Sequence, residues 1–361
     1  MLKLEPRPQP SRWMSVASPV LALVLTAILA AGLFAALGKD PVQGLSMYFV
    51  VPLSSLRQIS EVLLKATPLI IIALGLAVCY RSDVWNIGAE GQYLLGVLGG
   101  GGVALWLTTQ GLVLPKIVVV PLVVIGGTLG GMAWAAIVAL LRDRFNASEI
   151  LVSLMLVYVA QQLVNYMVFG PWKDPKGFGF PQTRNFDVST WLPNLIPGTR
   201  LHIGLLFAMA LVALTWVFMF RIYRGYQLQV GGLAPLAARY AGFSSSASLW
   251  TALMISGGLA GLAGALDAVG TLQQINPHLS AGLGFTAIIV CFVGRLNPLG
   301  IVFAGLLLSM MIIGGELGQS RLGLPNALTG VFQGLLLVLL LACDTLINYR
   351  IRVRSALAAA R

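Results

Sequence analysis

The feature that most constrains this chain is its succession of long apolar segments. A helix that crosses a bilayer needs about 20 mostly apolar residues. Six segments meet this requirement clearly: Val16–Leu37, Ile117–Leu141, Ile150–Phe169, Leu201–Phe220, Leu249–Gly270 and Leu324–Cys343. Four shorter segments form two tight hairpins: Ala66–Tyr80 with Ile87–Leu107, and Leu283–Gly294 with Leu299–Gly315. The sequence therefore predicts an all-α, polytopic bundle of about ten transmembrane helices, organised as one domain over residues 1–361.

The composition excludes a water-soluble fold. Hydrophobic residues make up 58% of the 361 residues and charged residues only 10%, whereas soluble domains usually carry about 25% charged residues. A soluble protein this apolar would expose large hydrophobic patches and aggregate. The net charge of +11 also raises the question of nucleic acid, but the basic residues lie between apolar runs and do not cluster with aromatic residues. We therefore expect membrane lipids, and no nucleic acid, around the chain.

Arginines at the ends of the apolar segments orient the predicted helices. Short cytoplasmic loops carry an excess of Lys and Arg. With ten crossings and the N-terminus inside, Arg142, Arg144 and the run Arg350–Arg354 all fall on the cytoplasmic side. The expected cytoplasmic segments are then residues 1–15, 221–247 and 348–361, and residues 170–200 form an extracytoplasmic loop. Both chain termini are predicted to be cytoplasmic.

Cysteine and histidine give no sign of a metal site. The three cysteines, Cys79, Cys291 and Cys343, lie inside apolar segments without ligand spacing, which is typical of small buried hydrophobic residues. His202 and His278 are far apart in the sequence. An enzyme would need a nucleophile and a base, or metal ligands, facing one another. The sequence therefore predicts a non-catalytic protein with no metal and no cofactor.

Two polar stretches interrupt the predicted hairpins. The first, in the turn 81–92, contributes three candidate residues: Asn86, Glu90 and Gln92. The second, in residues 273–285, contributes four: Gln273, Gln274, Asn276 and Phe285. Polar groups inside a bilayer are costly, so their positions are informative. Such residues either line a water-filled path or hydrogen-bond broken helix ends to neighbouring helices, and the sequence favours neither interpretation.

The two polar stretches fall on opposite sides of the predicted membrane. This placement suggests an inverted repeat in which Ala66–Phe169 matches Leu249–Cys343. Repeats of this kind form the pathway in many transporters. A shared preference for certain residues at helix starts explains the similarity at least as well.

Glycines four residues apart indicate close helix packing. The pairs are Gly96 with Gly100, Gly126 with Gly130, and Gly257 with Gly261. Small residues at this spacing let two helix backbones approach closely in a membrane. The pattern predicts a tightly packed bundle and carries no information about a substrate.

A third informative segment lies in the predicted cytoplasmic loop. Pro235–Ala241 is predicted to be a short helix, with Pro235 in its first turn and Gly242 as its C-terminal stop. A small, Ala-rich helix along the membrane face is suited to docking into a groove on a partner. An ordinary interfacial connector would show the same pattern, so both interpretations stay open.

The polar stretches and the short helix belong to a longer series of motifs: Asn86-Ile-Gly-Ala-Glu-Gly-Gln92, Asn146-Ala-Ser-Glu-Ile-Leu-Val-Ser-Leu-Met155, Ala237-Ala-Arg-Tyr-Ala-Gly242, and Asn276-Pro-His-Leu-Ser-Ala-Gly-Leu-Gly-Phe-Thr-Ala-Ile288 with Gly294-Arg-Leu-Asn-Pro-Leu-Gly300. Taken in this order, the motifs resemble those of one family, the permease subunits of bacterial ABC importers of the simple-sugar, nucleoside and branched-chain amino acid type. They are spread over about residues 60–345. The first motif is most similar to that of permeases paired with lipoprotein-type nucleoside-binding proteins.

The resemblance implies a multi-pass transport subunit in a bacterial cytoplasmic (inner) membrane. This chain and a second permease subunit, the product of a different gene, would enclose the pathway for a nucleoside or simple sugar. A periplasmic or lipid-anchored binding protein would deliver the solute, and cytoplasmic ABC ATPase subunits would drive transport. A coupling helix in contact with the ATPase would comprise Pro235, Ala237, Ala238, Arg239, Tyr240, Ala241 and Gly242.

Two further sequence observations bear on this expectation. The chain contains no Gly-x-x-x-x-Gly-Lys-Ser/Thr phosphate loop, so ATP hydrolysis is expected on a separate subunit. The alternative is a stand-alone secondary transporter of a small polar solute, which needs intramembrane acids for ion coupling. The acids near spans, Glu90, Asp267 and Glu316, all lie close to span ends, which makes ion coupling the less favoured mechanism.

Overall fold

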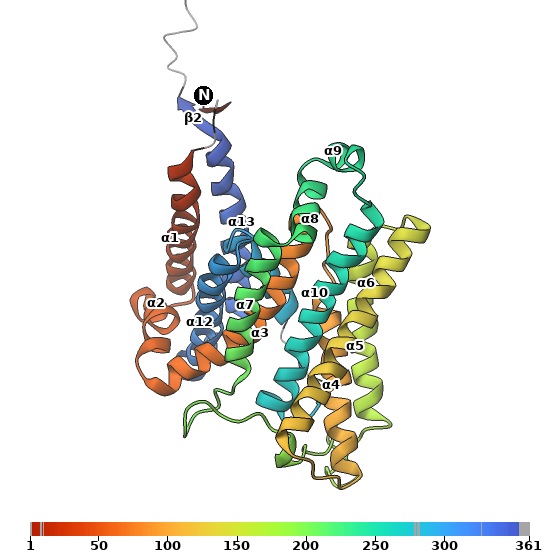
Figure 1. Cartoon of the computed structure of the whole chain (residues 1–361). Helices are drawn as coiled ribbons and strands as arrows, with labels where there is room; N and C mark the ends of the chain where they lie inside the picture. The colour runs from red at the N-terminus through yellow and green to blue at the C-terminus, as the bar shows by residue number, and fades with distance from the viewer. Residues whose placement is uncertain are drawn as a thin grey trace, which may run out of the picture. The chain divides into compact units, whose positions relative to one another are not determined.

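The computed structural model is predominantly helical (Figure 1). It describes residues 2–353 apart from 8, 10, 278, 280, 281 and 326, so His278 and residues 354–361 of the predicted basic tail lie outside the described residues. The α-helices are α1 (Arg12–Ala36), α2 (Pro41–Phe49), α3 (Leu56–Arg81), α4 (Ala89–Thr109), α5 (Lys116–Phe145), α6 (Glu149–Phe169), α7 (Gly204–Arg221), α8 (Tyr223–Leu233), α9 (Pro235–Tyr240), α10 (Ser245–Asp267), α11 (Leu283–Val293), α12 (Pro298–Leu322) and α13 (Ala327–Asn348). Short helical turns are η1 (Val51–Leu53), η2 (Val188–Thr190) and η3 (Ala268–Leu272), and the strands are β1 (Leu2–Pro6) and β2 (Tyr349–Val353).

Within the described part of the chain, 8 helices are long and apolar enough to cross a membrane: α1, α3, α5, α6, α7, α10 together with η3, α12 and α13. Each corresponds to one of the predicted spans, so the all-α polytopic bundle is confirmed. The other two predicted spans correspond to α4 and α11. With 21 residues, α4 has the length of a span, but its glycine-rich sequence is not among the eight candidate spans.

Helix α11 is shorter than the crossing predicted for Leu283–Gly294. It has 11 residues and, at about 1.5 Å per residue, extends roughly 16 Å, about half of a hydrocarbon core of about 30 Å. Residues 273–277 approach it as irregular backbone. Non-helical backbone at membrane depth is tolerated only where it is buried in protein or lines a cavity. The predicted hairpin therefore contains a half-length helix.

Polar side chains define several helix ends. The hydroxyl oxygens of Ser148 and Ser244 accept hydrogen bonds from backbone N–H groups in the first turns of α6 and α10, which satisfies donors that the helix leaves free. Helix α5 ends at Asn146, whose φ of 52° is left-handed, a conformation that Asn tolerates better than most residues. The basic residues Arg142 and Arg144 lie in the last turn of α5, where cations interact favourably with the helix dipole.

The chain forms two compact units, which are described separately. Unit 1 comprises Met1–Gln58 and Met310–Arg361. In it α1 packs along α13, and the rings of Phe34 and Tyr48 lie 5.4 and 5.3 Å from the ring of Phe332. Strand β1 pairs antiparallel with β2, from Leu2 opposite Val353 to Pro6 opposite Tyr349.

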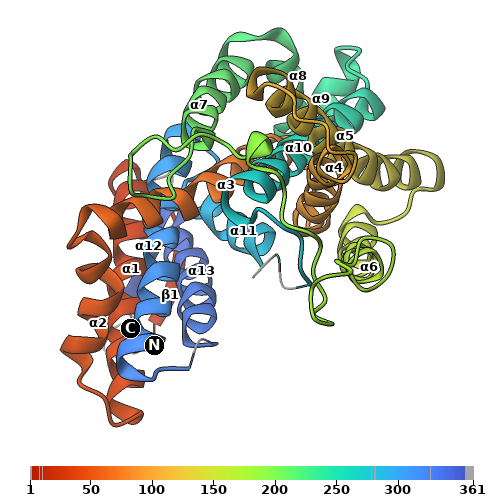
Figure 2. The same cartoon turned by 90° about the horizontal axis from the view of Figure 1, so that it is seen from below.

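Unit 2 comprises Ile59–Ser309, and α4, α5 and α10 lie side by side in it (Figures 1 and 2). Glycines make this close approach possible. A Cβ atom at Gly257 would lie 2.7 Å from the carbonyl oxygen of Gly131, and one at Gly130 would lie 2.5 Å from that of Leu95. A Cβ at Gly96 would overlap the backbone of Gly261. The predicted packing role of these glycines is confirmed.

Candidate functional site

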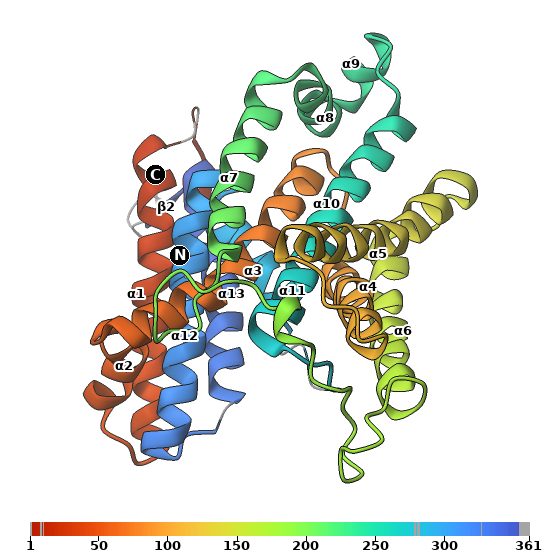
Figure 3. The ribbon, with the colours of Figure 1, turned by 60° about the horizontal axis from the view of Figure 1, so that its bottom comes forward.

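A short helix, α9, lies at one end of unit 2, beyond α7 and α10 (Figure 3). The prediction of this helix is confirmed: it begins at Pro235 and ends at Tyr240, one residue short of the predicted end. Gly242 follows it with a φ of 79°, in the left-handed region that glycine adopts without strain. The residue types that indicated the helix ends in the sequence therefore lie at its actual ends.

Large apolar side chains of this segment face away from the protein. The exposed fractions are 85% for Leu236 and 96% for Tyr240, and Leu233 just before α9 is 86% exposed. Ala238, by contrast, is only 4% exposed. The other residues assigned to the coupling helix, Pro235, Ala237, Arg239, Ala241 and Gly242, are exposed. The sequence interpretation included Tyr240 but missed Leu236, although the spacing of four residues between the two could have revealed a common face.

Helix α9 follows α8, and α8 is hydrogen-bonded to the rest of the bundle. The guanidinium of Arg81, the last residue of α3, donates a hydrogen bond to the side-chain oxygen of Gln229 at 3.0 Å and another to the Leu296 carbonyl at 2.9 Å. The Gln229 amide nitrogen in turn donates to the Met219 carbonyl at 2.5 Å. Arg81 thus links α3 with α8 and with the turn that follows α11. A displacement of α9 would be transmitted through α8 to both of these elements.

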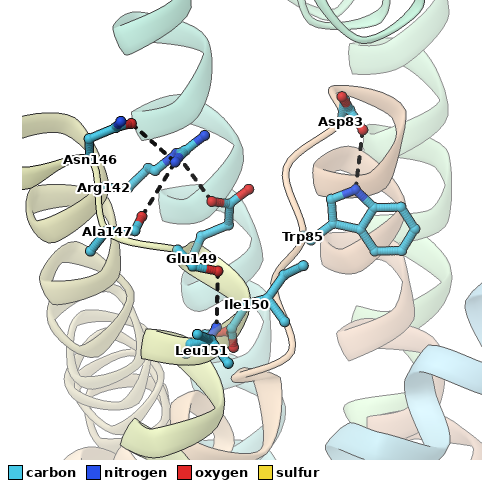
Figure 4. A network of polar contacts seen from close by, with 10 residues as sticks. Asp83, Trp85, Arg142, Asn146, Ala147, Glu149, Ile150 and Leu151 are labelled. Atoms are coloured by element: carbon cyan, nitrogen blue, oxygen red, sulfur yellow. Dashed lines mark hydrogen bonds and ion pairs between the residues drawn. The ribbon is translucent and has the colours of Figure 1, made fainter.

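A polar cleft of about 840 Å³ adjoins α9. Its lining comes from the α3–α4, α5–α6 and α9–α10 connections and includes Asp83, Arg142, Glu149 and Arg239. Figure 4 shows its best-connected part: Arg142 lies 3.1 Å from the carboxylate of Glu149 and donates to the side-chain oxygen of Asn146 at 3.2 Å. Charged and polar groups therefore gather at the α9 end of unit 2.

Asn86 is the centre of a buried hydrogen-bond network. Its side-chain amide donates to Gln92 and to the hydroxyl of Ser256, both at 2.9 Å. Its side-chain oxygen accepts from the backbone N–H of Gly88 at 3.0 Å and from Gln92 at 3.2 Å. Asn86 and Gln92 are fully buried. A side-chain amide has two donor hydrogens and two acceptor sites, so Asn86 uses its whole hydrogen-bonding capacity within the protein.

The structure brings the two polar stretches together at Glu90. This residue is 5% exposed, and its carboxylate accepts a hydrogen bond from the backbone N–H of Gly284 at 2.6 Å. Gly284 lies in the first turn of α11, whose free N–H groups and dipole favour a negative charge. The beginnings of α4 and α11, which are 194 residues apart in the sequence, therefore meet at this hydrogen bond.

Residues 273–275 of the second polar stretch are hydrogen-bonded to the loop 170–200, which is predicted to be extracytoplasmic. The Gln273 carbonyl accepts from the N–H of Phe186 at 2.8 Å, and the Ile275 carbonyl accepts from that of Thr183 at 2.9 Å. Gln273, with a left-handed φ of 58°, is half-buried, as are Gln274 and Asn276, and Phe285 is 40% exposed. These four residues are thus more accessible than Asn86 and Gln92. Figure 1 shows the loop at the end of unit 2 opposite α9.

Two further points concern metal binding and the predicted inverted repeat. Among the described residues no group of three or more His, Cys, Asp or Glu side chains could hold a metal ion. The inverted repeat stays a prediction: each proposed half contains four helices in sequence order, but α11 has 11 residues where α4 has 21. In any such repeat, the second helices of the two halves therefore differ in length.

In the described part of the chain, the long apolar helices, the half-length α11 and the short exposed α9 define a multi-pass membrane protein. The chain belongs to the family described as branched-chain amino acid transport system / permease component, which it matches over residues 58–341. It is 33% identical to the glucose ABC transporter permease protein TsgB13 of Haloferax volcanii, over 98% of this chain and 94% of that protein. It is 29% identical to the nucleoside ABC transporter permease protein NupB of Lactococcus lactis, over 87% of each chain. With the guanosine ABC transporter permease protein NupP of Bacillus subtilis it shares 27% identity over 89% of this chain and 91% of that protein. The chain is the permease subunit of an ABC importer.

Proposed function

We propose that this permease forms one side of the pathway of an importer for a nucleoside or a simple sugar in a bacterial cytoplasmic membrane. The names of its relatives support this solute class, since they include glucose, nucleoside and guanosine permeases. A second permease subunit would complete the pathway, and a periplasmic or lipid-anchored binding protein would deliver the solute. ATP would be hydrolysed by separate cytoplasmic subunits.

The exposed apolar face of α9 carries this proposal. An isolated apolar residue on a surface needs no explanation, but Leu233, Leu236 and Tyr240 lie within eight residues and are each at least 85% exposed. We assign this face, rather than buried Ala238, to contact with an ATPase subunit. Through α8 and Arg81, movement of the ATPase would reach α3 and the turn after α11.

The charge distribution supports a cytoplasmic position for the α9 end. Arg142 and Arg144 in the last turn of α5 and Arg221 at the end of α7 lie at this end of the bundle, and arginines concentrate in cytoplasmic loops of membrane proteins. The loop 170–200 would then be extracytoplasmic.

The accessibility of the polar residues separates two roles along the pathway. We assign Asn86 and Gln92 to support of the α3–α4 turn, because their side chains are buried and bonded within the protein. We assign Gln273, Gln274, Asn276 and Phe285 to the pathway lining, because they remain accessible in this subunit. Glu90 would join the two regions through its contact with α11.

The test is a substitution on the exposed face of α9. In membranes that hold the complete transporter, Leu236→Asp and Tyr240→Asp should lower the amount of ATPase that co-purifies with the permease and reduce solute uptake at least tenfold. The physical reason is that a carboxylate would be buried without a partner in an apolar contact. Both measurements use the same detergent-solubilised preparation, in which the permease yield is also recorded.

The matched control is Tyr226→Asp, which places the same charge on an exposed Tyr of α8. Tyr226 is 57% exposed and lies outside the assigned face, so it should retain the ATPase. Normal uptake by the two α9 variants would contradict the coupling assignment. Uptake by the permease alone, without any ATPase, would favour a secondary transporter.

A further inference from the structure

Asp267 is an acid within a candidate membrane span. It is the last residue of α10, and the span continues through η3 to Leu272. Five residues of helix correspond to about 8 Å, so Asp267 lies between one and two turns inside the end of the span. Ionisable residues within spans are costly, and they commonly mark a pathway for a solute or an ion.

One carboxylate oxygen of Asp267 is held in place and the other is open. The hydroxyl of Tyr93, a fully buried residue of α4, donates a hydrogen bond to Oδ2 of Asp267 at 2.6 Å. Among the described residues, Oδ1 has no hydrogen-bond donor and the carboxylate forms no ion pair. Asp267 itself is only half-buried. The carboxylate is therefore fixed in orientation by Tyr93, with acceptor capacity to spare.

A second titratable neighbour of Asp267 is His202. His202 interacts electrostatically with Asp267, but burial lowers the pKa of the imidazole. Its Nδ1 accepts a hydrogen bond from the backbone N–H of Gly204 at 3.1 Å, which requires that nitrogen to be unprotonated. His202 thus holds the start of α7 through its Nδ1.

The backbone around Asp267 connects it to the accessible polar stretch. The next five residues form the π-helical turn η3, and Gln273 follows with its left-handed φ of 58°. π-Helical turns are rare and occur frequently at functional sites. A single π-helical turn therefore separates Asp267 from Gln273, Gln274 and Asn276, the residues assigned above to the pathway lining.

We propose that Asp267, positioned by Tyr93, is a subsite of the pathway that accepts hydrogen bonds from hydroxyl groups of a neutral solute. The proposal rests on the function proposed above and adds the chemistry by which the pathway recognises the solute. A single open carboxylate oxygen is suited to the hydroxyl of a sugar or a ribose ring. A metal cation would need several oxygen ligands, and among the described residues Asp267 belongs to no group of three or more His, Cys, Asp or Glu side chains that could hold one.

The test compares hydroxylated and deoxygenated probes in proteoliposomes that contain the complete transporter and its binding protein. The probes are guanosine with 2′-deoxyguanosine and 3′-deoxyguanosine, and glucose with 2-deoxyglucose. Uptake and ATP hydrolysis are both measured. Because every variant works with the same binding protein, the selectivity of that protein cancels in the comparison.

Asp267→Asn should lower uptake per ATP of the hydroxylated probe at least tenfold and reduce its preference over at least one deoxygenated probe, because a charged acceptor forms the stronger hydrogen bond. Its amide oxygen still accepts from Tyr93, so the α4–α10 link is kept. Tyr93→Phe, which releases the carboxylate, should lower uptake several-fold. The matched control, Glu316→Gln, removes an exposed acid of α12 and should leave uptake and preference unchanged.

Unchanged uptake and probe preference in Asp267→Asn would overturn the proposal. A purely structural role for the pair predicts a different pattern, in which Tyr93→Phe is impaired and Asp267→Asn is not, and this pattern would also overturn it. If Asp267→Asn does not assemble, the probe preference of Tyr93→Phe is measured instead. A reduced preference for the hydroxylated probe would support the proposal, and an unchanged preference would overturn it. A lack of uptake by the unsubstituted transporter for all five probes would instead contradict the function proposed above.

Discussion

At the scale of single residues, the clearest contrast is between Asn86 and Asp267. Asn86 lies in the most recognisable motif of the sequence, yet its side chain is fully buried and bonded within the protein. Asp267 lies in an ordinary apolar segment, yet it has an open carboxylate oxygen at membrane depth. Both differences depend on partners far along the chain: Ser256 is 170 residues from Asn86, and Tyr93 is 174 residues from Asp267. Sequence reasoning found Asn86 through its motif and had no local signal for the pairing of Asp267.

The assignment of Asn86 to support of the α3–α4 turn makes a prediction about stability. Asn86→Ala would leave the Gly88 N–H and the side chains of Gln92 and Ser256 short of partners, at a cost of about 1–3 kcal/mol for each buried group left unsatisfied. The purified variant should unfold at a lower temperature than the unsubstituted permease in a thermal melt in detergent. Asn194→Ala, which changes an exposed Asn, should not. A variant that keeps its melting temperature but loses uptake would place Asn86 in the pathway instead.

At the scale of secondary-structure elements, glycine determines how closely α4, α5 and α10 approach. Lipid does not drive helices together through the hydrophobic effect, so close backbone packing supplies much of the association energy. The glycine pairs identified in the sequence do make these contacts, although the sequence did not indicate which helices would pair. Helix α11 shows the reverse case. Its apolar sequence resembles a span, but the helix has 11 residues and follows irregular backbone at residues 273–277.

The packing of α5 against α10 can be tested with a single side chain. Gly261→Val would place carbon atoms within the backbone of α5, since a Cβ at this position already lies 2.9 Å from Cα of Gly131. We expect a strong loss of folded protein, measured as the monodisperse fraction in size-exclusion chromatography. Gly334→Val in α13 is the matched control, because a Cβ there meets nothing within 4 Å. Equal yields of the two variants would contradict a packing role for Gly261.

At the scale of the whole molecule, the orientation in the membrane connects the sequence to the proposed function. Only α7 lies between the loop 170–200 and α9 among the candidate spans, so one crossing separates them. The proposal requires the loop to face the binding protein and α9 to face the ATPase. The exposed side chains Phe178 in the loop (98% exposed) and Tyr240 in α9 are therefore expected on opposite sides of the membrane.

Cysteine labelling tests this orientation. Phe178→Cys should react with a membrane-impermeant maleimide in cells whose outer layers admit the reagent, whereas Tyr240→Cys should react only after the cytoplasmic membrane is opened. The native cysteines Cys79, Cys291 and Cys343 are buried, so the unsubstituted permease provides the background. Labelling of both variants from the same side would contradict the single crossing by α7, and reversed labelling would contradict the proposed orientation.

The sequence by itself determined that this protein is an α-helical membrane bundle, where most of its helices lie, and that a separate short helix begins at Pro235 and ends before Gly242. These properties depend on local features: in a bilayer, a segment of about 20 apolar residues must satisfy its own backbone hydrogen bonds, and proline and glycine define helix ends through their own conformations. Only the tertiary structure decided that Leu236 and Tyr240 face outward, that Glu90 meets Gly284, that Tyr93 orients Asp267 and that α11 extends through about half a membrane. Each of these depends on which distant segments pack together, and neither hydropathy nor helical periodicity contains that information.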